Sequence, residues 1–553
     1  MASPFQAPPA GTPVPPNTSA RYYTRSQVFS RVPISGSNWT SGKQASFVTE
    51  ATGGRYFVPS ESRIVAKIKV RSGTKANNSE AKSYADANKK LEKSVRFAAD
   101  PVTNMFSAGM MSINGTTIAS TQANLSDISI LQLRTEHTKA GADGGGSAGL
   151  LSFNQKMTPE DLNSADLDAL AGGSTPGKSN STAAETQAVL SKVYTTPDER
   201  SDKHELLLNN FSGDALADDG SDAKSLEISV PLGQLFPFCR TEYFLPNQQT
   251  RIDLTISDTF REDMFFTEVL RGQAGAAGVA LRSSSVKVAD GLASTEPSSI
   301  AKTIGDGTGA GGTGGKLTTA EVTVANYIPP VPAAARAPVV EIEDIFLDAM
   351  MAIPSDSGII ANPPKSLQVS YQDVSVYTRS LSSGHTFTEQ FTSIPPSIGA
   401  IVVGLRSSEH AIGNNRELYE LGGGPKGFSR FSCALGALQL PMPAFELDME
   451  SKAVGRSFAD WLSFIGGSYA NGVGGEGASL TSWTKSPLIA VRMLQDPGAY
   501  ASTLTLRFNT KTALEAADNA ELVLWTISSE VVEMFWDSGE TFPSRVIKDS
   551  VLN

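Results

Sequence analysis

The chain has 553 residues, of which 40% are hydrophobic and 19% are charged, and its formal net charge is −11. The hydrophobic fraction excludes an intrinsically disordered chain, and the low charged fraction excludes a long coiled coil. A net negative charge disfavours a protein that coats nucleic acid as a whole, because phosphate binding needs clustered cations. We find no secretory signal and no uncharged apolar run of the ~18 residues that a membrane-spanning helix needs, so we expect a soluble protein.

Residues 1–27 are rich in Pro, Ser and Thr and have no hydrophobic period, which predicts a flexible N-terminal arm. The first acidic residue is Glu50, and the cationic residues Arg21, Arg25 and Arg31 precede it. A cationic arm on an acidic protein is either a solvated tail or a segment that contacts an acidic neighbour, a lipid headgroup or packaged nucleic acid.

Residues 28–258 are predicted to consist mostly of strands. In Ser62–Val70, alternate residues such as Ile64 and Ile68 are apolar, which is the period of a half-buried strand. Further strands are expected at Arg55–Val58, Met110–Ile113, Thr116–Ser120, Leu226–Leu232 and Arg251–Ile256. Asn114 and Gly115 lie between two of these strands, and Asn-Gly is the strongest short-range signal for a β-hairpin.

Two long segments, 140–206 and 259–335, interrupt the strand pattern and contain runs of glycine. Loops of this length are uncommon in compact domains unless they are functional or contain structure of their own. We expect the first to be an exposed loop with a helix at Pro159–Ala171, where the opening Pro-Glu-Asp suits a first helical turn. The second is expected to be an inter-domain insert that can form its own hairpin.

A second series of strands follows Arg336. They are expected at Val339–Ile345, Leu367–Tyr377, Gly399–Leu405, Phe431–Leu440, Leu488–Met493, Leu504–Phe508 and Glu521–Ile527. Many short strands separated by turns are typical of antiparallel sandwiches, so the sequence predicts an all-β protein with two large β domains. The expected divisions are an arm at 1–27, a first domain at 28–258, an insert at 259–335, a second domain at 336–540 and a C-terminal tail at 541–553.

No group of residues indicates an enzyme. The four histidines lack metal-ligand spacing, and no nucleophile-elbow motif is present. Glu446, Asp448 and Glu450 alternate and either form a solvated strand face or offer oxygen ligands for a cation. Cys239 and Cys433 lie in apolar surroundings and are expected to be buried reduced thiols. We therefore expect no catalytic residue, cofactor, metal or small-molecule substrate.

Three groups of segments follow one another along the chain: Tyr56–Val70, then Pro101–Phe106 with Met111–Thr116, then Ile228–Phe238 with Arg251–Ile256. Taken together and in this order, they resemble the double jelly-roll major capsid proteins of icosahedral DNA viruses, especially those of polinton-like viruses, adintoviruses and virophages. The structural motif of the first jelly roll then comprises Asn114, Gly115, Pro231, Leu232, Phe236 and Phe238. In that motif the proline ends strand pairing, and the large apolar residues fill the base of a sandwich.

The resemblance implies two tandem eight-stranded antiparallel jelly rolls with long loops and a few short helices. It also implies a homotrimer that forms a pseudo-hexagonal capsomer, a shell assembled inside the host cell, and a place in the virion. The implied partners are other copies of the chain, neighbouring capsomers, and penton and minor capsid proteins. The arm would contact the genome or an inner membrane, with Arg21, Arg25 and Arg31 as candidates for assembly contacts.

Two other classes stay open at this point. A β-rich viral spike, adhesin or carbohydrate-binding protein would present an aromatic ligand platform and calcium-binding carboxylates at its surface. An enzyme would depend on one of the four histidines.

Overall fold

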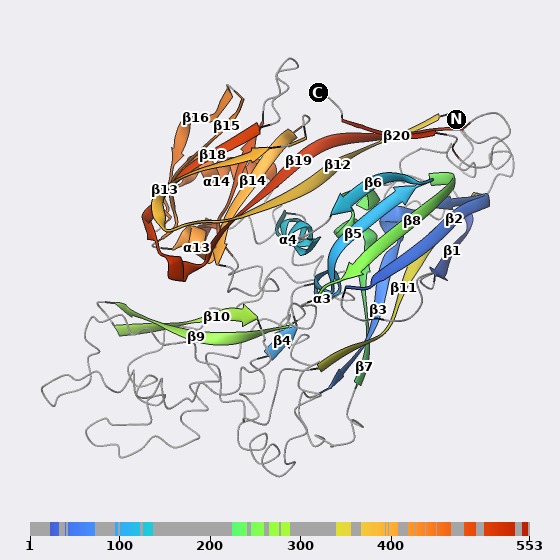
Figure 1. The fold of residues 1–553 in the computed structure, drawn as a ribbon, viewed down its shortest axis with the longest axis horizontal. Coiled ribbons are helices and arrows are strands. Elements are labelled where there is room, and N and C mark those ends of the chain that lie inside the picture. The colour runs from blue at the N-terminus through green and yellow to red at the C-terminus, as the bar shows by residue number, and fades with distance from the viewer. Residues whose placement is uncertain are drawn as a thin grey trace, which may run out of the picture.

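The computed structural model describes residues 23–31, 39, 42–71, 95–97, 100–121, 125–135, 224–240, 245–258, 265–275, 278–287, 339–354, 366–392, 394–395, 398–407, 419–424, 426–436, 438–449, 451–465, 480–493, 503–536, 543 and 545–550. These residues form two β units built from antiparallel sheets, with a few short helices (Figure 1). The prediction of an all-β fold is confirmed. The loop at 140–206, the helix expected at Pro159–Ala171 and Arg21 lie outside the described residues.

The first unit is built on an eight-stranded sheet with the order β6-β5-β8-β2-β11-β3-β7, to which β1 adds by pairing with β11. Its strands are β1 (Tyr23–Arg31), β2 (Gln44–Phe57), β3 (Arg63–Arg71), β5 (Phe106–Ile113), β6 (Thr116–Thr121), β7 (Lys224–Pro231), β8 (Leu245–Ile256) and β11 (Val339–Pro354). In β3, Ile64, Ala66 and Ile68 are fully buried, whereas Arg63 and Lys67 are exposed. The predicted period of two is thus confirmed at these residues, although Val65 on the opposite face is buried as well.

The hairpin predicted at Asn114-Gly115 is also confirmed, because β5 and β6 pair antiparallel on either side of it. Asn114 has φ 47° and Gly115 has φ 82°, so both turn residues adopt the left-handed conformation. Two left-handed central residues are what a two-residue type I′ hairpin turn requires.

Two boundaries of the first unit differ from expectation. Tyr23–Gln27 belong to β1 and pair with β11, so the arm predicted at 1–27 is too long. Val339–Ile345 was expected in the second unit, but it lies in β11, which pairs with β3 from Val339↔Arg71 to Asp348↔Arg63. The alternation of apolar residues predicts a strand but does not say which sheet the strand joins.

A smaller sheet has the order β10-β9-β4 and consists of β4 (Val95–Phe97), β9 (Phe265–Gly275) and β10 (Gly278–Lys287). β9 and β10 pair antiparallel, from Gly275↔Gly278 outward. The segment 259–335 therefore contains a hairpin of its own.

The second unit consists of two antiparallel sheets with the orders β12-β19-β14-β17 and β13-β18-β15-β16. The strands are β12 (Ser366–Ser380), β13 (Gly384–Thr392), β14 (Ile398–Ser407), β15 (Phe428–Leu435), β16 (Leu438–Glu446), β17 (Leu488–Arg492), β18 (Thr503–Leu514) and β19 (Ala520–Phe535). Numbered from one to eight in chain order, they form sheets 1-8-3-6 and 2-7-4-5. The pairs 1-8, 2-7, 3-6 and 4-5 are those of a long antiparallel hairpin wound into a sandwich, which is a jelly roll.

Two details of this unit were not predicted. β13 was missed, and the single strand expected at Phe431–Leu440 is two strands, β15 and β16, separated by Gly436 with φ 59°. Gly436 permits this left-handed turn without the steric cost that a side chain would bring.

The first unit repeats part of the same winding. Its pairs β2·β8, β3·β7 and β5·β8 correspond to pairs 1-8, 2-7 and 3-8 of the second unit. Within the described residues, both units therefore share the outer pairs of a jelly roll.

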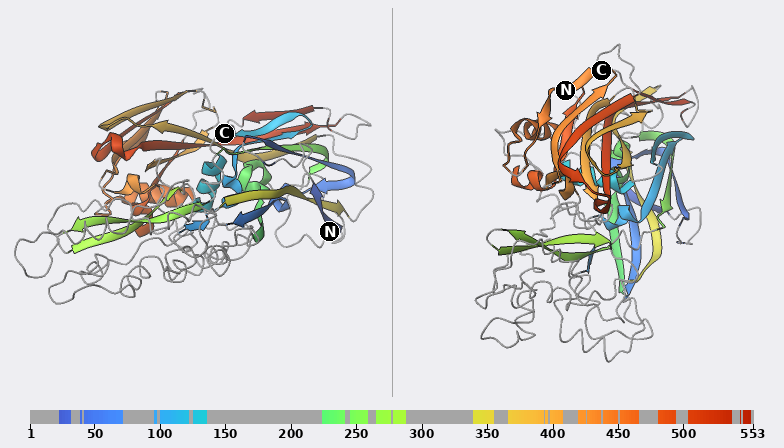
Figure 2. Two further views of the ribbon diagram at one scale, coloured as in Figure 1. Left: turned by 60° about the horizontal axis from the view of Figure 1, so that its bottom comes forward. Right: turned by 60° about the vertical axis from the view of Figure 1, so that its left-hand side comes forward.

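The sheet that contains β12 and β19 serves both hydrophobic cores. The part of it near Val369 and Met534 is buried in the first core, whereas Leu524 and Trp525 are buried in the second. Figures 1 and 2 show these strands running from the second unit across the first. β20 (Arg545–Ser550) pairs with this end of β19, so the C-terminal tail expected at 541–553 contains a strand.

The short helices lie mostly at the ends of strands. They are η1 (Pro59–Glu61), α3 (Pro101–Asn104), α4 (Leu125–Thr135), α9 (Leu232–Leu235), η4 (Pro237–Arg240), α13 (Glu420–Gly423), α14 (Gly455–Phe464), α15 (Leu480–Lys485) and η6 (Ala516–Asp518). None of the helices in the described residues is long and apolar enough to cross a membrane.

Candidate functional site

The arginines proposed for assembly contacts are only partly placed by the structure. Arg25 and Arg31 lie in β1, at opposite ends of its pairing with β11, where Arg25 is opposite Ile353 and Arg31 is opposite Leu347. Arg25 and Arg31 therefore belong to the first strand of the first unit.

The motif residues that follow β7 lie at one end of the first core. β7 ends at Pro231, and Leu232, Phe236 and Phe238 in the turns that follow are fully buried. Phe238 makes an edge-to-face contact with Tyr371 of β12, with ring centroids 5.2 Å apart. This end of the first core therefore contacts a strand of the second unit directly.

The Asn-Gly turn connects three parts of the chain. The Asn114 side-chain oxygen accepts a hydrogen bond from the Gln249 backbone N–H at 2.8 Å, and its amide nitrogen donates to the Pro543 carbonyl at 3.1 Å. Beyond the turn, Lys548 of β20 donates to the Ile118 carbonyl at 2.8 Å and pairs with Asp373 at 2.7 Å. The turn thus joins β8 and the segment before β20 to the β5–β6 hairpin.

A group of buried polar contacts surrounds α4 (Leu125–Thr135), which lies between the two units (Figure 1). The buried helix carries residues of both cores, with Leu125 and Ile128 in the first and Ile130 and Leu131 in the second. α4 is not predicted from the sequence, because its apolar residues lie on opposite faces and give no single amphipathic stripe. Its usable signals were Asp127 in the first turn and Arg134 in the last turn, where each charge is stabilised by the helix dipole.

On the side of the second unit, Asp127 forms a buried ion pair with Arg406 of β14, with Oδ1 and Nη1 2.6 Å apart. Arg406 Nε also pairs with Glu521 of β19 at 2.7 Å. The Asp127 carbonyl accepts a hydrogen bond from the indole N–H of Trp525 at 2.9 Å. One turn of α4 is thus bonded to two neighbouring strands of the second unit.

At the other end of α4, Arg134 donates to the carbonyl of Ser486 at 2.7 Å and to its hydroxyl at 2.8 Å. The Arg134 guanidinium also lies over the Tyr419 ring, 5.2 Å from its centroid. Tyr419 is fully buried, and burial raises the pKa of its phenol far above the ordinary value, so the hydroxyl stays protonated.

On the side of the first unit, Ser129 of α4 donates to the Asp100 carboxylate, which also accepts from the hydroxyl and backbone N–H of Thr103. The Gln234 amide donates to the Ser129 hydroxyl at 3.1 Å. Burial raises the pKa of Asp100 to about 6, although the hydrogen bonds from Ser129 and Thr103 oppose the shift.

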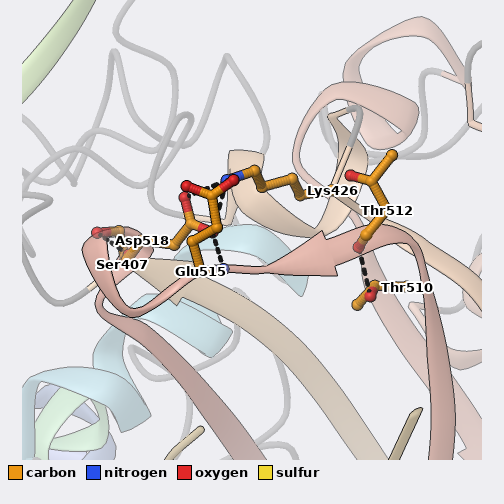
Figure 3. A network of polar contacts seen from close by, with 6 residues as sticks. All are labelled: Ser407, Lys426, Thr510, Thr512, Glu515 and Asp518. Carbon is orange, nitrogen blue, oxygen red and sulfur yellow. Dashed lines mark hydrogen bonds and ion pairs between the residues drawn. The ribbon is translucent and has the colours of Figure 1, made fainter. Parts of the chain in front are cut away.

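A second polar cluster lies within the second unit, where the β18–β19 turn meets the end of β14 (Figure 3). Lys426 Nζ contacts both carboxylate oxygens of Asp518 at 2.8 Å and lies 3.6 Å from Glu515. The Ser407 hydroxyl donates to the Asp518 carbonyl at 2.9 Å. Partial burial lowers the pKa of Lys426, but the contacts with Asp518 raise it overall, so the amine stays charged and is a structural cation rather than a base.

Of the three carboxylates considered as a cation site, Glu450 lies outside the described residues, and the other two form ion pairs. Glu446 pairs with Arg430 at 3.3 Å, and Asp448 pairs with Lys511 at 3.6 Å. Among the described residues, no group of three or more His, Cys, Asp and Glu side chains could hold a metal ion. The prediction of two buried thiols is confirmed, since Cys239 and Cys433 are both buried and free of disulfides.

Met442 is the one large apolar residue that is strongly exposed among the described residues, at 72%. It lies between Pro441 and Pro443 on β16, the edge strand of its sheet. Arg456 donates to the carbonyls of Met442 and Pro443 at 3.2 and 2.7 Å. Because proline has no N–H, this edge resists the addition of another strand.

No family model matches the sequence, and no curated protein matches it. Among solved structures, the chain is similar to a chain of the Sputnik virophage structure, with a TM-score of 0.46 and 10% identity over 96% of this chain and 89% of that one. It is similar to the mavirus major capsid protein, with a TM-score of 0.45 and 11% identity over 96% and 91% of the two chains. It is also similar to the Faustovirus major capsid protein, with a TM-score of 0.45 and 10% identity over 93% and 90%.

Proposed function

We propose that this chain is the major capsid protein of an icosahedral DNA virus and that its place is the shell of the virion. The observation that carries the proposal is the strand winding, 1-8-3-6 and 2-7-4-5, in the second unit, with its outer pairs repeated in the first. The segments that resemble double jelly-roll capsid proteins lie in the first of these two units. The resemblance in sequence and the winding of the strands thus support the same function independently.

The way the two units are joined suits a shell protein. β12 and β19 contribute to both cores, and α4 is buried between them. A shell subunit must keep its shape under lateral contact with many copies, and a shared core resists relative movement of its parts. A catalytic role has no comparable support, because the charged groups of the two polar clusters are bonded to other residues of the chain, either as ion pairs or through hydrogen bonds to serine and threonine.

We propose further that three copies associate so that six β units form a pseudo-hexagonal capsomer. Contacts between the copies should be large and more apolar than the remaining surface. Neighbouring capsomers and penton and minor capsid proteins are the further partners. The segment that carries Arg21, Arg25 and Arg31 would contact a neighbouring subunit, the genome or an inner membrane.

Light scattering and negative-stain microscopy of the purified full-length chain test this proposal. We expect a stable particle of three times 58.3 kDa with a pseudo-hexagonal outline. A protein that stays monomeric at micromolar concentration would contradict the proposal. Glycan binding by such a monomer would favour the spike, adhesin or carbohydrate-binding alternative.

Deletion of residues 1–22, which precede β1, tests the role of the arm separately. We expect the truncated chain to form trimers and to lose shell assembly. Normal shells from the truncated chain would exclude a role of this segment in assembly.

A further inference from the structure

α4 has two opposite faces, and each one is bonded to a different unit. Residues three or four positions apart lie on the same side of a helix, so Leu125, Ile128 and Ser129 share one face. Asp127 and Arg134 lie on the other face, together with the two residues that enter the second core, Ile130 and Leu131. The exposed fraction is only 1% for Asp127 and 6% for Arg134, so both charged side chains are enclosed by protein.

We propose that α4 sets the angle between the two β units, with Asp127 and Arg134 as the positioning residues that select a single relative placement. The apolar packing shared through β12 and β19 resists movement of the units, but the hydrophobic effect behind it is non-directional, so directional bonds add the selection of one placement. Charge-assisted hydrogen bonds are directional, and an arginine that holds a carboxylate fixes both position and orientation.

The bonds that cross to the second unit come from three separate groups of α4. The Asp127 carboxylate binds Arg406, the Asp127 carbonyl binds Trp525, and the Arg134 guanidinium binds Ser486. The partners lie on β14, on β19 and just after α15, so three separate elements of the second unit hold the same face of the helix. A rotation or translation of α4 that keeps one of these bonds would break another.

α4 is also held firmly by the first unit. The Ser129 hydroxyl binds Asp100, and the Gln234 side chain binds both the carbonyl and the hydroxyl of Ser129. The helix therefore cannot turn independently of the first unit. Since one face of α4 is bonded to each unit, the helix fixes the orientation of the second unit relative to the first.

If the chain has the proposed function, the angle between its two units determines how regular the capsomer is. In a capsomer of three chains, the two β units of each chain occupy neighbouring corners of a hexagon. A single angle would give a regular outline, and a spread of angles would prevent regular lateral contacts between capsomers. Loss of the α4 contacts should therefore impair shells more than it impairs folding.

Pulsed electron spin resonance measures the distance between two labels, which changes when the angle between the units changes. Arg63→Cys on β3 and Thr388→Cys on β13 place one exposed label on each unit, and the native thiols are buried and do not compete for the reagent. Dilution with unlabelled chain removes distances between copies. The test variants are the double substitution Asp127→Leu with Arg406→Met, the single substitution Arg134→Met, and the triple combination.

The double substitution removes both members of the ion pair, so no buried charge is left without its partner. Glu521, the other partner of Arg406, has 21% of its side chain exposed and can be solvated. Arg430→Gln is the matched control, because it breaks an ion pair that is exposed and lies within the second unit. Circular dichroism verifies the fold of each variant.

We expect a single narrow distance for the unmodified chain and for Arg430→Gln, and a broad distribution for the triple variant. If the triple variant does not fold, Arg134→Met, which keeps the ion pair, is expected to broaden the distribution to a smaller extent. A narrow and unchanged distance in every folded variant would overturn the inference. Failure of the unmodified chain to form trimers would contradict the proposed function and leave this distance measurement intact.

Discussion

The two β units differ in how much of their structure each one supplies itself. The second unit draws its eight sandwich strands from one continuous stretch, β12 to β19, and winds them into both of its sheets. The first unit takes β11 into its sheet from beyond the segment 259–335, and its core contains residues of β12 and β19. The second unit thus takes all eight sandwich strands from one stretch of the chain. The first unit, in contrast, needs β11 and residues of β12 and β19, which follow it in sequence. Two units with related windings therefore need not be equally stable on their own.

Breaking the ion pair that joins the units is expected to have the largest effect. Arg406→Met leaves the Asp127 carboxylate buried without its partner, which typically costs about 3–5 kcal/mol of unfolding free energy. Arg430→Gln removes an exposed pair and should cost at most about 1 kcal/mol. Chemical denaturation measures both changes. Equal effects of the two substitutions would show that the buried ion pair adds no more stability than the exposed one.

Two substitutions in β19 test whether one strand supports both cores. Leu524→Ala removes a side chain from the second core and Met534→Ala removes one from the first, and both residues are fully buried. Each should lower the unfolding free energy by about 2–5 kcal/mol, because each leaves a cavity. If Met534→Ala were nearly neutral in denaturation experiments, the first unit would not depend on the second in the way described.

The contact between α4 and the first unit is expected to make the free energy of unfolding depend on pH, because it contains the Asp100 carboxyl group. Burial raises its pKa in the folded protein from 3.8 to about 6, so the folded state binds more protons than the unfolded state between these values. The stability that this group contributes is therefore complete below about pH 4 and is lost as the pH rises through 6, by up to roughly 3 kcal/mol. Asp100→Asn should abolish this loss in melting curves recorded from pH 4 to 7. An unchanged pH dependence in the variant would assign the effect to other groups.

Asn114→Ala is expected to have a smaller effect, about 1–3 kcal/mol. It removes the hydrogen bonds to Gln249 and Pro543, and it places a less tolerant residue at a positive φ. Hydrogen exchange of the β20 amides should become faster, because the segment before β20 loses its contact with the hairpin. Asn114→Gly keeps the turn conformation and isolates the side-chain bonds, so slow exchange in that variant would show that the bonds do not hold β20.

The features that the sequence predicted correctly are local ones. The alternation in β3 and the Asn114-Gly115 turn depend on neighbouring residues, and both lie where they were expected. β13 was missed because Phe387 and Phe391 are its only buried apolar side chains in a run of polar residues. A strand with so few core contacts carries little hydrophobic signal.

Features that depend on partners distant in sequence could not be predicted. Asp127 and Arg406 are separated by 279 positions, and neither residue has a neighbour that indicates an ion pair. The placement of β11 in the first sheet depends on its pairing with β3, which no local pattern specifies. The candidate site was therefore missed for the same reason as the domain boundary, because both are set by pairing across the chain.

Each core contains one buried cysteine thiol, so thiol alkylation can follow the opening of each unit separately in the unmodified chain. Cys239 lies in the first core, beside Met111, and Cys433 lies in the second. Burial raises the pKa of Cys433 to about 12 and that of Cys239 further, so neither thiol reacts until its own core admits solvent. The rate at which each thiol is alkylated then reports the lifetime of one unit. Because the second unit draws all its sandwich strands from one stretch of chain, we expect Cys239 to react first under mild denaturation.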